Sequence, residues 1–284
     1  MRMKIFYSPK CLEYKHPNHP ESPDRIGRTA DYLTKKGFTF IEPRSALKED
    51  ILRVHSKTMF EGVKAGTQSD YDTPAIPGIF DNAMLSAGSA IQAAEAAIKS
   101  EPAFSLMRPP GHHATKDRVM GFCYFNNIAI ASAKVLDRFP ENKIAILDID
   151  CHHGNGTEDI FLNHSSIIYV SLHQSPLYPG TGLQSRSNCY NFPLFPGTEE
   201  TGYLETLQNA CNIIRQFSPA LIGVSAGFDT CRNDPLSHLN LDVESYQKIS
   251  EIISGLKIPT FIIMEGGYSS DLPECVFSFL VGFE

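Results

Sequence analysis

Two acids and two histidines follow an apolar run in the segment Ala145-Ile-Leu-Asp-Ile-Asp-Cys-His-His-Gly-Asn-Gly156. The run 144–147 is typical of a buried strand. Asp150 and His152 are two residues apart, so at the end of an extended strand they point to the same side. A carboxylate oxygen beside an imidazole nitrogen is a ligand pair that suits Zn²⁺. A strand followed by a polar turn explains this segment equally well, so other segments must decide.

A second pair of histidines lies in Arg108-Pro-Pro-Gly-His-His-Ala114, after a predicted strand at 103–107. Adjacent histidines on a loop are not expected to face one way. We therefore expect one of His112 and His113 to face a pocket and the other to pack behind it. A single histidine here would more often be structural, but two His pairs are typical of a proton-transfer site with a metal.

Two further apolar runs end in residues that could complete such a site. Leu221-Ile-Gly-Val-Ser-Ala-Gly-Phe-Asp229 ends in an acid, so Asp229 can be a third ligand from a different strand. Phe261-Ile-Ile-Met-Glu-Gly-Gly-Tyr268 ends in a tyrosine hydroxyl, and Gly266 and Gly267 allow the backbone to approach a substrate closely. Ligands of open α/β sheets bind at the carboxyl ends of strands, so these groups point to one shared site.

The elements that must position these residues alternate between strand and helix, which is typical of a layered α/β fold. The run 81–99 is rich in alanine, with Asp81 as the expected N-cap. The expected strands are 3–7, 38–41, 103–107, 144–147 and 167–172, besides the two runs above, and the expected helices are 23–36, 48–54, 57–66, 81–99, 126–139, 157–162, 199–217, 242–254 and 272–281.

Taken together, the motifs make the chain similar to the zinc-dependent deacetylases of the histone deacetylase and acetylpolyamine amidohydrolase superfamily. The similarity runs from His19-Pro-Glu-Ser-Pro-Asp-Arg-Ile26 through Tyr268. It is greatest to the class II and bacterial branch. In this chain Asn155-Gly156-Thr157 follows the His pair, and Glu265 precedes Gly266-Gly267. Class I members typically have other residues at these positions.

The resemblance implies a single open, mostly parallel sheet flanked by helices, in the three-layer sandwich of arginases and deacetylases. It implies one deacetylase catalytic domain over residues 1–284. The implied activity is removal of acetyl or other short acyl groups from lysine side chains of proteins or peptides. Deacetylation of acetylpolyamines is the alternative.

The resemblance assigns one Zn²⁺ to Asp150, His152 and Asp229, the three ligands that the residue types also favour. These ligands leave open positions for water and a carbonyl oxygen. Tyr268 would donate a hydrogen bond to the developing oxyanion.

In the same family His113 is the general base and acid, and His112 is its electrostatic partner. Asp148 is not on the zinc in this interpretation and can hold His112. Asn155 would lie behind His113, where class I enzymes have Asp. A neutral partner stabilises an imidazolium less than a carboxylate does, so we expect a lower pKa for His113 than with Asp.

A structural potassium ion behind the zinc is also implied by the resemblance. Asp148, the hydroxyl of Ser171 and the carbonyl of Leu172 would be among its ligands. In the sequence, only the match of Val170-Ser-Leu-His173 supports this ion.

A linear acetyl-lysine side chain needs a narrow apolar tunnel. Phe122 and Tyr178 match the family's two tunnel aromatics, and the Gly121 carbonyl could accept the substrate N–H. Asp72 matches an acid that grips the substrate backbone at the rim. Taken alone, each aromatic is more often a core residue, and Asp72 could be a surface turn acid.

Position 236 separates the two substrate classes. Polyamine-selective relatives have an acid near the tunnel mouth, whereas this chain has Leu236 in Asp234-Pro-Leu-Ser237. We therefore favour an acetylated protein or peptide over an acetylated polyamine, although the net charge of −7 would suit a polyamine too.

Two rival functions are weaker. An arginase-like manganese hydrolase needs a second metal, but Gly154 occupies the position two after His152. A catalytically silent acyl-lysine binding module would not need the complete set of His113, Tyr268 and three ligands.

The composition limits the partners and the compartment. The negative net charge argues against direct nucleic-acid binding. Seven cysteines, an odd number without C-x-x-C spacing, favour a reducing compartment. The N-terminal apolar run is too short for a signal peptide, and no run approaches the length that spans a bilayer. We expect a cytoplasmic protein without a membrane partner; the sequence does not specify an oligomeric state.

Overall fold

The computed structural model describes residues 3–283, so residues 1, 2 and 284 of the expected domain lie outside the described part. These residues form an eight-stranded sheet whose strands all pair in parallel, in the order β2-β1-β3-β8-β7-β4-β5-β6. The expected fold class is confirmed. The strands are β1 Lys4–Phe6, β2 Phe40–Ile41, β3 Ala103–Ser105, β4 Ile144–Asp148, β5 Ile167–Gln174, β6 Cys189–Leu194, β7 Leu221–Ala226 and β8 Thr260–Met264.

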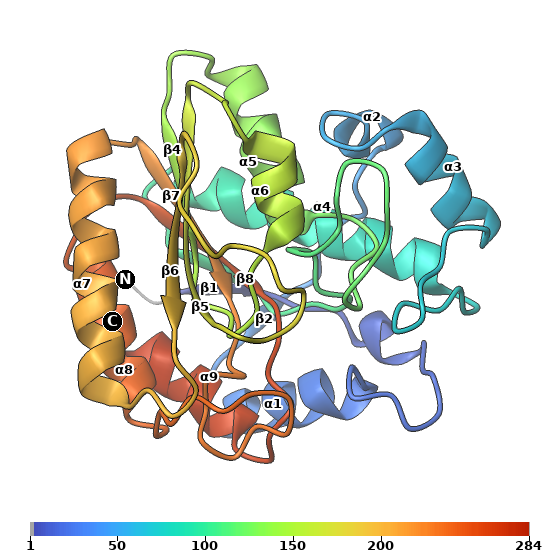
Figure 1. The fold of residues 1–284 in the computed structure, drawn as a ribbon. Coiled ribbons are helices and arrows are strands. Elements are labelled where there is room, and N and C mark those ends of the chain that lie inside the picture. Colours follow the sequence, from blue (N-terminus) through green and yellow to red (C-terminus); the bar gives the residue numbers. More distant parts are fainter. Residues whose placement is uncertain (1–2, 284) are drawn as a thin grey trace.

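Helices cover both faces of the sheet (Figure 1). Local signals start several of them: Pro23 opens the first turn of α1, and the side chain of Asn126 accepts a hydrogen bond from the backbone N–H of Ala129 at the start of α5. The helices are η1 Pro9–Leu12, α1 Pro23–Lys35, α2 Lys48–Ile51, α3 Lys57–Ala65, α4 Ile79–Ala97, α5 Asn127–Arg138, α6 Asn155–Phe161, α7 Glu200–Phe217, α8 Ser245–Ser254 and α9 Leu272–Val281.

Each face of the sheet has its own hydrophobic core. Along β4, Ala145 and Leu147 pack into the core that α1, α7, α8 and α9 cover, whereas Ile144 and Ile146 pack into the core under α4 and α5. A strand buried on both faces is apolar throughout rather than alternating, which explains the continuous apolar runs in the sequence.

Two sequence expectations differ from the structure. Asp81 is not an N-cap, because α4 begins at Ile79 after Gly78. Gly78 adopts a left-handed φ of 79°, which suits glycine, and its carbonyl accepts a hydrogen bond from the side chain of Asn82. Sequence analysis also did not identify β6. That strand is at the edge of the sheet and contains Pro193, and its sequence Cys-Tyr-Asn-Phe-Pro-Leu does not alternate between apolar and polar residues.

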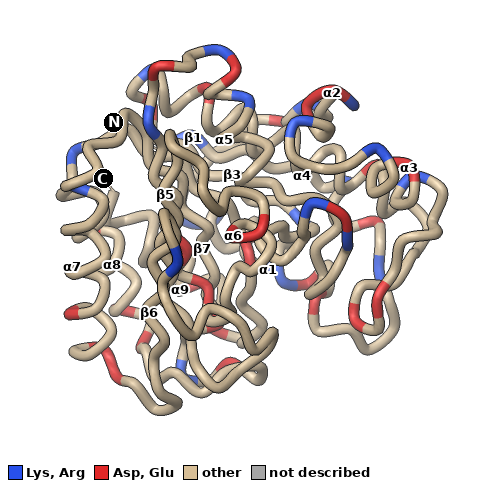
Figure 2. The backbone as a smooth tube through the Cα atoms, turned by 45° about the horizontal axis from the view of Figure 1, so that its top comes forward, with Lys and Arg blue, Asp and Glu red and all other residues tan. Residues whose placement is uncertain are grey.

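Charged residues of both signs are spread over the outer helices and loops (Figure 2). The seven cysteines are buried and form no disulfide within residues 3–283. In the same range, no helix is both long and apolar enough to cross a membrane.

Candidate metal and catalytic site

Polar residues follow four strands that are neighbours in the sheet, in the order β3-β8-β7-β4. Because all four run in parallel, their carboxyl ends meet at one edge. The segments that follow them carry His112 and His113 after β3, Tyr268 after β8, Asp229 after β7, and Asp150 and His152 after β4. The topology therefore brings together the groups that sequence analysis assigned to one site.

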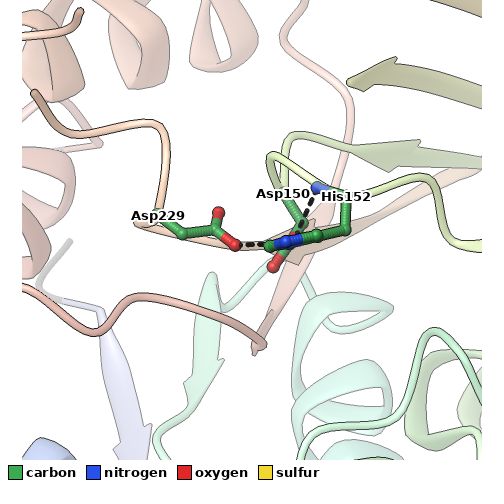
Figure 3. A group of neighbouring side chains, drawn as sticks. All are labelled: Asp150, His152 and Asp229. Carbon is green, nitrogen blue, oxygen red and sulfur yellow. Dashed lines mark hydrogen bonds and ion pairs between the residues drawn. The ribbon is translucent and has the colours of Figure 1, made fainter. Parts of the chain in front are cut away.

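Asp150, His152 and Asp229 form a buried cluster whose candidate ligand atoms lie within 4.8 Å of one another. The imidazole of His152 contacts both carboxylates, and its interaction with Asp229 is drawn as a dashed line (Figure 3). Its Nδ1 atom is 2.8 Å from Oδ2 of Asp229 and 3.1 Å from Oδ1 of Asp150. Two carboxylate oxygens and one imidazole nitrogen are a donor set that Zn²⁺ accepts, with positions left for water and substrate.

The electrostatics of the cluster also fit a cation. Burial and the nearby Asp150 raise the pKa of Asp229 to about 7, although His152 opposes the shift. Two buried carboxylates resist ionising together unless a positive charge lies between them. The backbone leaves room for such an ion, because a Cβ atom at Gly266 would be only 2.6 Å from Oδ2 of Asp150 and of Asp229.

His112 is buried, and a carboxylate lies near each of its ring nitrogens. Its Nδ1 atom is 3.0 Å from Oδ2 of Asp148, and its Nε2 atom is 3.8 Å from Oδ1 of Asp150. Burial alone would lower the pKa of His112, but the charges of Asp148 and Asp150 raise it to about 10. This geometry favours a positively charged His112 at neutral pH.

His113 lies beside it, with the two ring centroids 4.0 Å apart. Its Nδ1 atom is 2.8 Å from Oδ1 of Asn155. Burial, together with the neighbouring charges of His112 and His152, holds the pKa of His113 well below its usual range. The two histidines therefore favour opposite charge states.

Our expectation that only one of these histidines faces the pocket is wrong. Both line the same cavity. The chain at 111–113 forms a turn rather than a strand, so side chains of consecutive residues need not alternate between two sides. The other pair behaves as expected for alternation: His152 lines the cavity, whereas His153 packs against His173 and Glu158.

Tyr268 is partly buried, and its ring has a cation on one side. The guanidinium of Arg25 lies 4.6 Å from the ring centroid, and the backbone N–H of Tyr268 donates to Oδ2 of Asp234 at 2.6 Å. Burial holds the pKa of Tyr268 well above its usual range, although Arg25 opposes the shift. The hydroxyl therefore keeps its proton at neutral pH and can donate a hydrogen bond.

Of these groups, the two histidines of the turn, Asp150, His152 and Tyr268 line a cavity of about 260 Å³, whereas Asp229 and Asn155 lie outside its lining. The ring of Tyr178 lies 5.2 Å from that of His113, and the ring of Phe122 lies 5.9 Å from that of Tyr268. The lining residues are Asp72, Pro110, His112, His113, Gly121, Phe122, Asp150, His152, Leu177, Tyr178, Leu236, Gly266 and Tyr268.

Some expected site residues lie outside this lining. The φ of Gly267 is +121°, and its carbonyl accepts a hydrogen bond from Nε of Arg25 at 2.6 Å, away from the cavity. Asp148 and Ser171 are register partners on β4 and β5, and Leu172 follows within β5, fully buried. The Ser171 hydroxyl is 2.9 Å from Nδ1 of His173. The expected potassium ligands are thus neighbours behind the cavity.

Sequence analysis missed several residues that support the site. Pro110 and Leu177 line the cavity, and Tyr169 donates from its hydroxyl to Oδ2 of Asp148 at 2.9 Å. Arg25 and Asp234 hold the Tyr268 segment. Both lie inside the quoted motifs, which was the available signal, whereas Tyr169 carries no signal in the sequence.

Comparisons with known proteins agree with this geometry. The histone deacetylase domain family matches residues 19–280. A probable deacetylase from Archaeoglobus fulgidus is 36% identical over 290 residues, covering 93% of this chain and 80% of that protein. Acetylpolyamine amidohydrolase 2 from Pseudomonas aeruginosa is 38% identical over 212 residues, or 70% of this chain and 61% of that protein. The crystal structure of an acetylpolyamine aminohydrolase from Burkholderia pseudomallei superposes with a TM-score of 0.92 at 28% identity, covering 99% of this chain and 98% of that one.

Proposed function

Because the chain belongs to the histone deacetylase domain family, we propose that it is a zinc-dependent amidohydrolase that removes acetyl or other short acyl groups from primary amines. The observation that carries this proposal is the buried Asp150–His152–Asp229 cluster opening into a cavity that also holds His113 and Tyr268. A zinc ion bound by the three ligands would supply Lewis-acid polarisation of the amide carbonyl and an activated water.

The proton transfers of amide hydrolysis would be carried out by His113. The amide oxygen of Asn155 faces Nδ1 of His113, so Nδ1 carries the ring proton and Nε2 is the ring's acceptor. A low pKa keeps His113 neutral and ready to take a proton from the attacking water. His113 then returns this proton to the leaving amine, acting first as base and then as acid.

The negative charge that develops on the amide oxygen during attack must be stabilised by a hydrogen-bond donor. Tyr268 keeps its hydroxyl proton at neutral pH, and the adjacent Arg25 cation makes that hydroxyl a stronger donor. His112, charged through its carboxylate partner Asp148, adds positive potential beside the same oxygen.

For the substrate we favour acetyl-lysine in a protein or peptide. Phe122 and Tyr178 on the cavity wall suit a linear aliphatic chain, with the Gly121 carbonyl able to accept the substrate N–H. Leu236 at the cavity lining offers no charge to a distal ammonium.

Acetylpolyamines are the second candidate, and two observations favour them. Asp72, an acid, is among the residues that line the cavity. A relative named acetylpolyamine amidohydrolase is 38% identical over 70% of this chain, beside 36% over 93% for one named probable deacetylase, and a structural neighbour named acetylpolyamine aminohydrolase superposes with a TM-score of 0.92. With either substrate, a potassium ion held by Asp148, Ser171 and the Leu172 carbonyl would have a structural role.

The test is zinc content together with hydrolysis of a short acetyl-lysine peptide, acetylputrescine and acetylspermidine. One zinc per chain with peptide turnover supports the favoured substrate. Turnover of the polyamines alone keeps the amidohydrolase and replaces its substrate. Bound zinc without turnover of any of the three contradicts both acetyl substrates and points to a different acyl group or to a binding role.

A further inference from the structure

Glu265 is a fully buried acid at the end of β8 that the proposed chemistry does not use. Its Oε2 atom accepts hydrogen bonds from the backbone N–H of Gly111 at 2.7 Å and of His112 at 3.2 Å. Its Oε1 atom accepts from the hydroxyl of Ser225 on β7 at 3.0 Å. The carboxylate thus joins β7 and β8 to the turn that carries the two histidines.

The peptide unit between His112 and His113 is held as well. The carbonyl of His112 accepts hydrogen bonds from the N–H groups of Gly156 and Thr157 in the first turn of α6, both at 3.1 Å. On the remaining side, a Cβ atom at Gly111 would collide with the backbone of Asn127. The N–H of His112 is therefore fixed by a carboxylate and its carbonyl by a helix N-terminus, which leaves the backbone at the histidine pair little freedom.

Stability alone does not explain a carboxylate at this place. Burial raises the pKa of Glu265 to about 7, although the charge of His112 and the N–H of Gly111 oppose the shift. Burying an acid costs free energy that an apolar side chain of similar volume would not. Besides the Ser225 hydroxyl, the partners of its carboxylate are the two amides of the histidine turn. The backbone carbonyl of Glu265 accepts from Arg25, whose guanidinium lies over Tyr268.

We propose that Glu265 is a positioning residue that sets the rings of His112 and His113 against the zinc ligands, an inference that rests on the proposed function. It acts through the peptide between Gly111 and His112 and not by touching the substrate. Displacing that peptide moves both rings relative to Asp150 and His152. Misplacement of reacting groups by about 1 Å can cost on the order of 100-fold in rate.

The experiment compares two substitutions at this position. E265L removes both acceptor oxygens. E265Q keeps one oxygen to accept from the two amides, and its NH₂ group can donate a hydrogen bond to the Ser225 hydroxyl. We expect E265L to lower kcat about 100-fold with KM within about threefold, and E265Q to recover most of that loss. The matched control is S225A, which removes one buried hydrogen bond to the same carboxylate but keeps those from the amides of Gly111 and His112. It should retain near-wild-type kcat. E265M, an unbranched apolar residue, replaces E265L if the leucine variant does not fold.

A second measurement separates positioning from general stability. In an H113A background the E265L substitution should cost little further kcat, because residues that act as a unit are not additive. Equal loss in both backgrounds, wild-type kcat in folded E265L, or the same loss in S225A would each overturn the proposal.

A readout without substrate keeps this proposal distinct from the proposed function. The ring Nδ1 proton of His112, hydrogen-bonded to Asp148, should give a low-field proton NMR signal that H112N removes. We expect E265Q and S225A to keep this signal at its wild-type position and E265L to shift or lose it. An unshifted signal in E265L contradicts the role of Glu265 even if the protein hydrolyses none of the tested amides.

Discussion

The imidazole Nδ1 of His113 lies 2.8 Å from the amide oxygen of Asn155, so a neutral group orients the ring proposed as general base. The neighbouring His112 has a carboxylate in the equivalent place. This difference separates the two rings electrostatically, because one partner stabilises an imidazolium through its charge and the other only through a hydrogen bond.

The first prediction concerns that neutral partner. N155D places a negative charge beside His113 and should raise the pKa of its imidazolium by about 1 unit. Because the base must be neutral to accept a proton, the acid limb of the kcat/KM profile should move to higher pH. N163D, which adds the same charge at an exposed residue after α6, should leave the limb in place. An acid limb that moves to lower pH in N155D would reject this role for Asn155.

The second prediction concerns the oxyanion donor. Y268F keeps the ring over Arg25 and removes the hydroxyl, so only the interaction with the developing charge is lost. We expect kcat to fall by about 100- to 1000-fold, the usual cost of removing one oxyanion donor, with zinc content unchanged. Steady-state kinetics with metal analysis of the same sample measures both. Wild-type kcat in Y268F would mean that a group other than Tyr268 stabilises the oxyanion.

The third prediction links the metal cluster to stability in metal-free protein. The ordinary pKa of an Asp, 3.8, rises to about 7 for buried Asp229. Between pH about 4 and 7 the folded state therefore holds a proton that the unfolded state has released. The stability that this proton contributes is present below pH 4 and is lost as the pH rises to 7.

Denaturant unfolding of metal-free protein at several pH values tests this sign. Stability should fall more steeply from pH 4 to 7 in the wild type than in D229N, where the titrating group is absent. Added Zn²⁺ should stabilise the wild type at pH 7 and have a much smaller effect on D229N. Identical pH slopes in the two proteins would contradict the raised pKa of Asp229.

The fourth prediction concerns substrate choice at the cavity lining. L236E introduces a negative charge where the wild type has an apolar side chain. The ratio of kcat/KM for acetylspermidine to that for an acetyl-lysine peptide should rise by about fivefold, since an exposed charge pair contributes up to about 1 kcal/mol. L236Q, which is polar but neutral, separates the charge from the change of shape. A similar ratio in both variants would place the polyamine's second ammonium away from position 236.

The apolar runs that end in His112, Asp150, Asp229 and Tyr268 could be identified from the sequence because each strand and its terminal motif are local. Parallel topology then brings those ends to one edge of the sheet without further information. The helix start at Ile79 and the edge strand β6 were missed for local reasons, a left-handed glycine and a proline-containing strand without clear alternation.

The sequence by itself thus determined the α/β class, the family resemblance and the residues proposed to carry chemistry, because these depend on residue types within short segments. Only the tertiary structure decided how those residues are held. Glu265 meets Gly111 across 154 positions of the chain, and Arg25 reaches Gly267 across 242. No periodicity or motif encodes such contacts, since they arise when separate strands and loops pack, and they hold the backbone segments that carry His112, His113 and Tyr268.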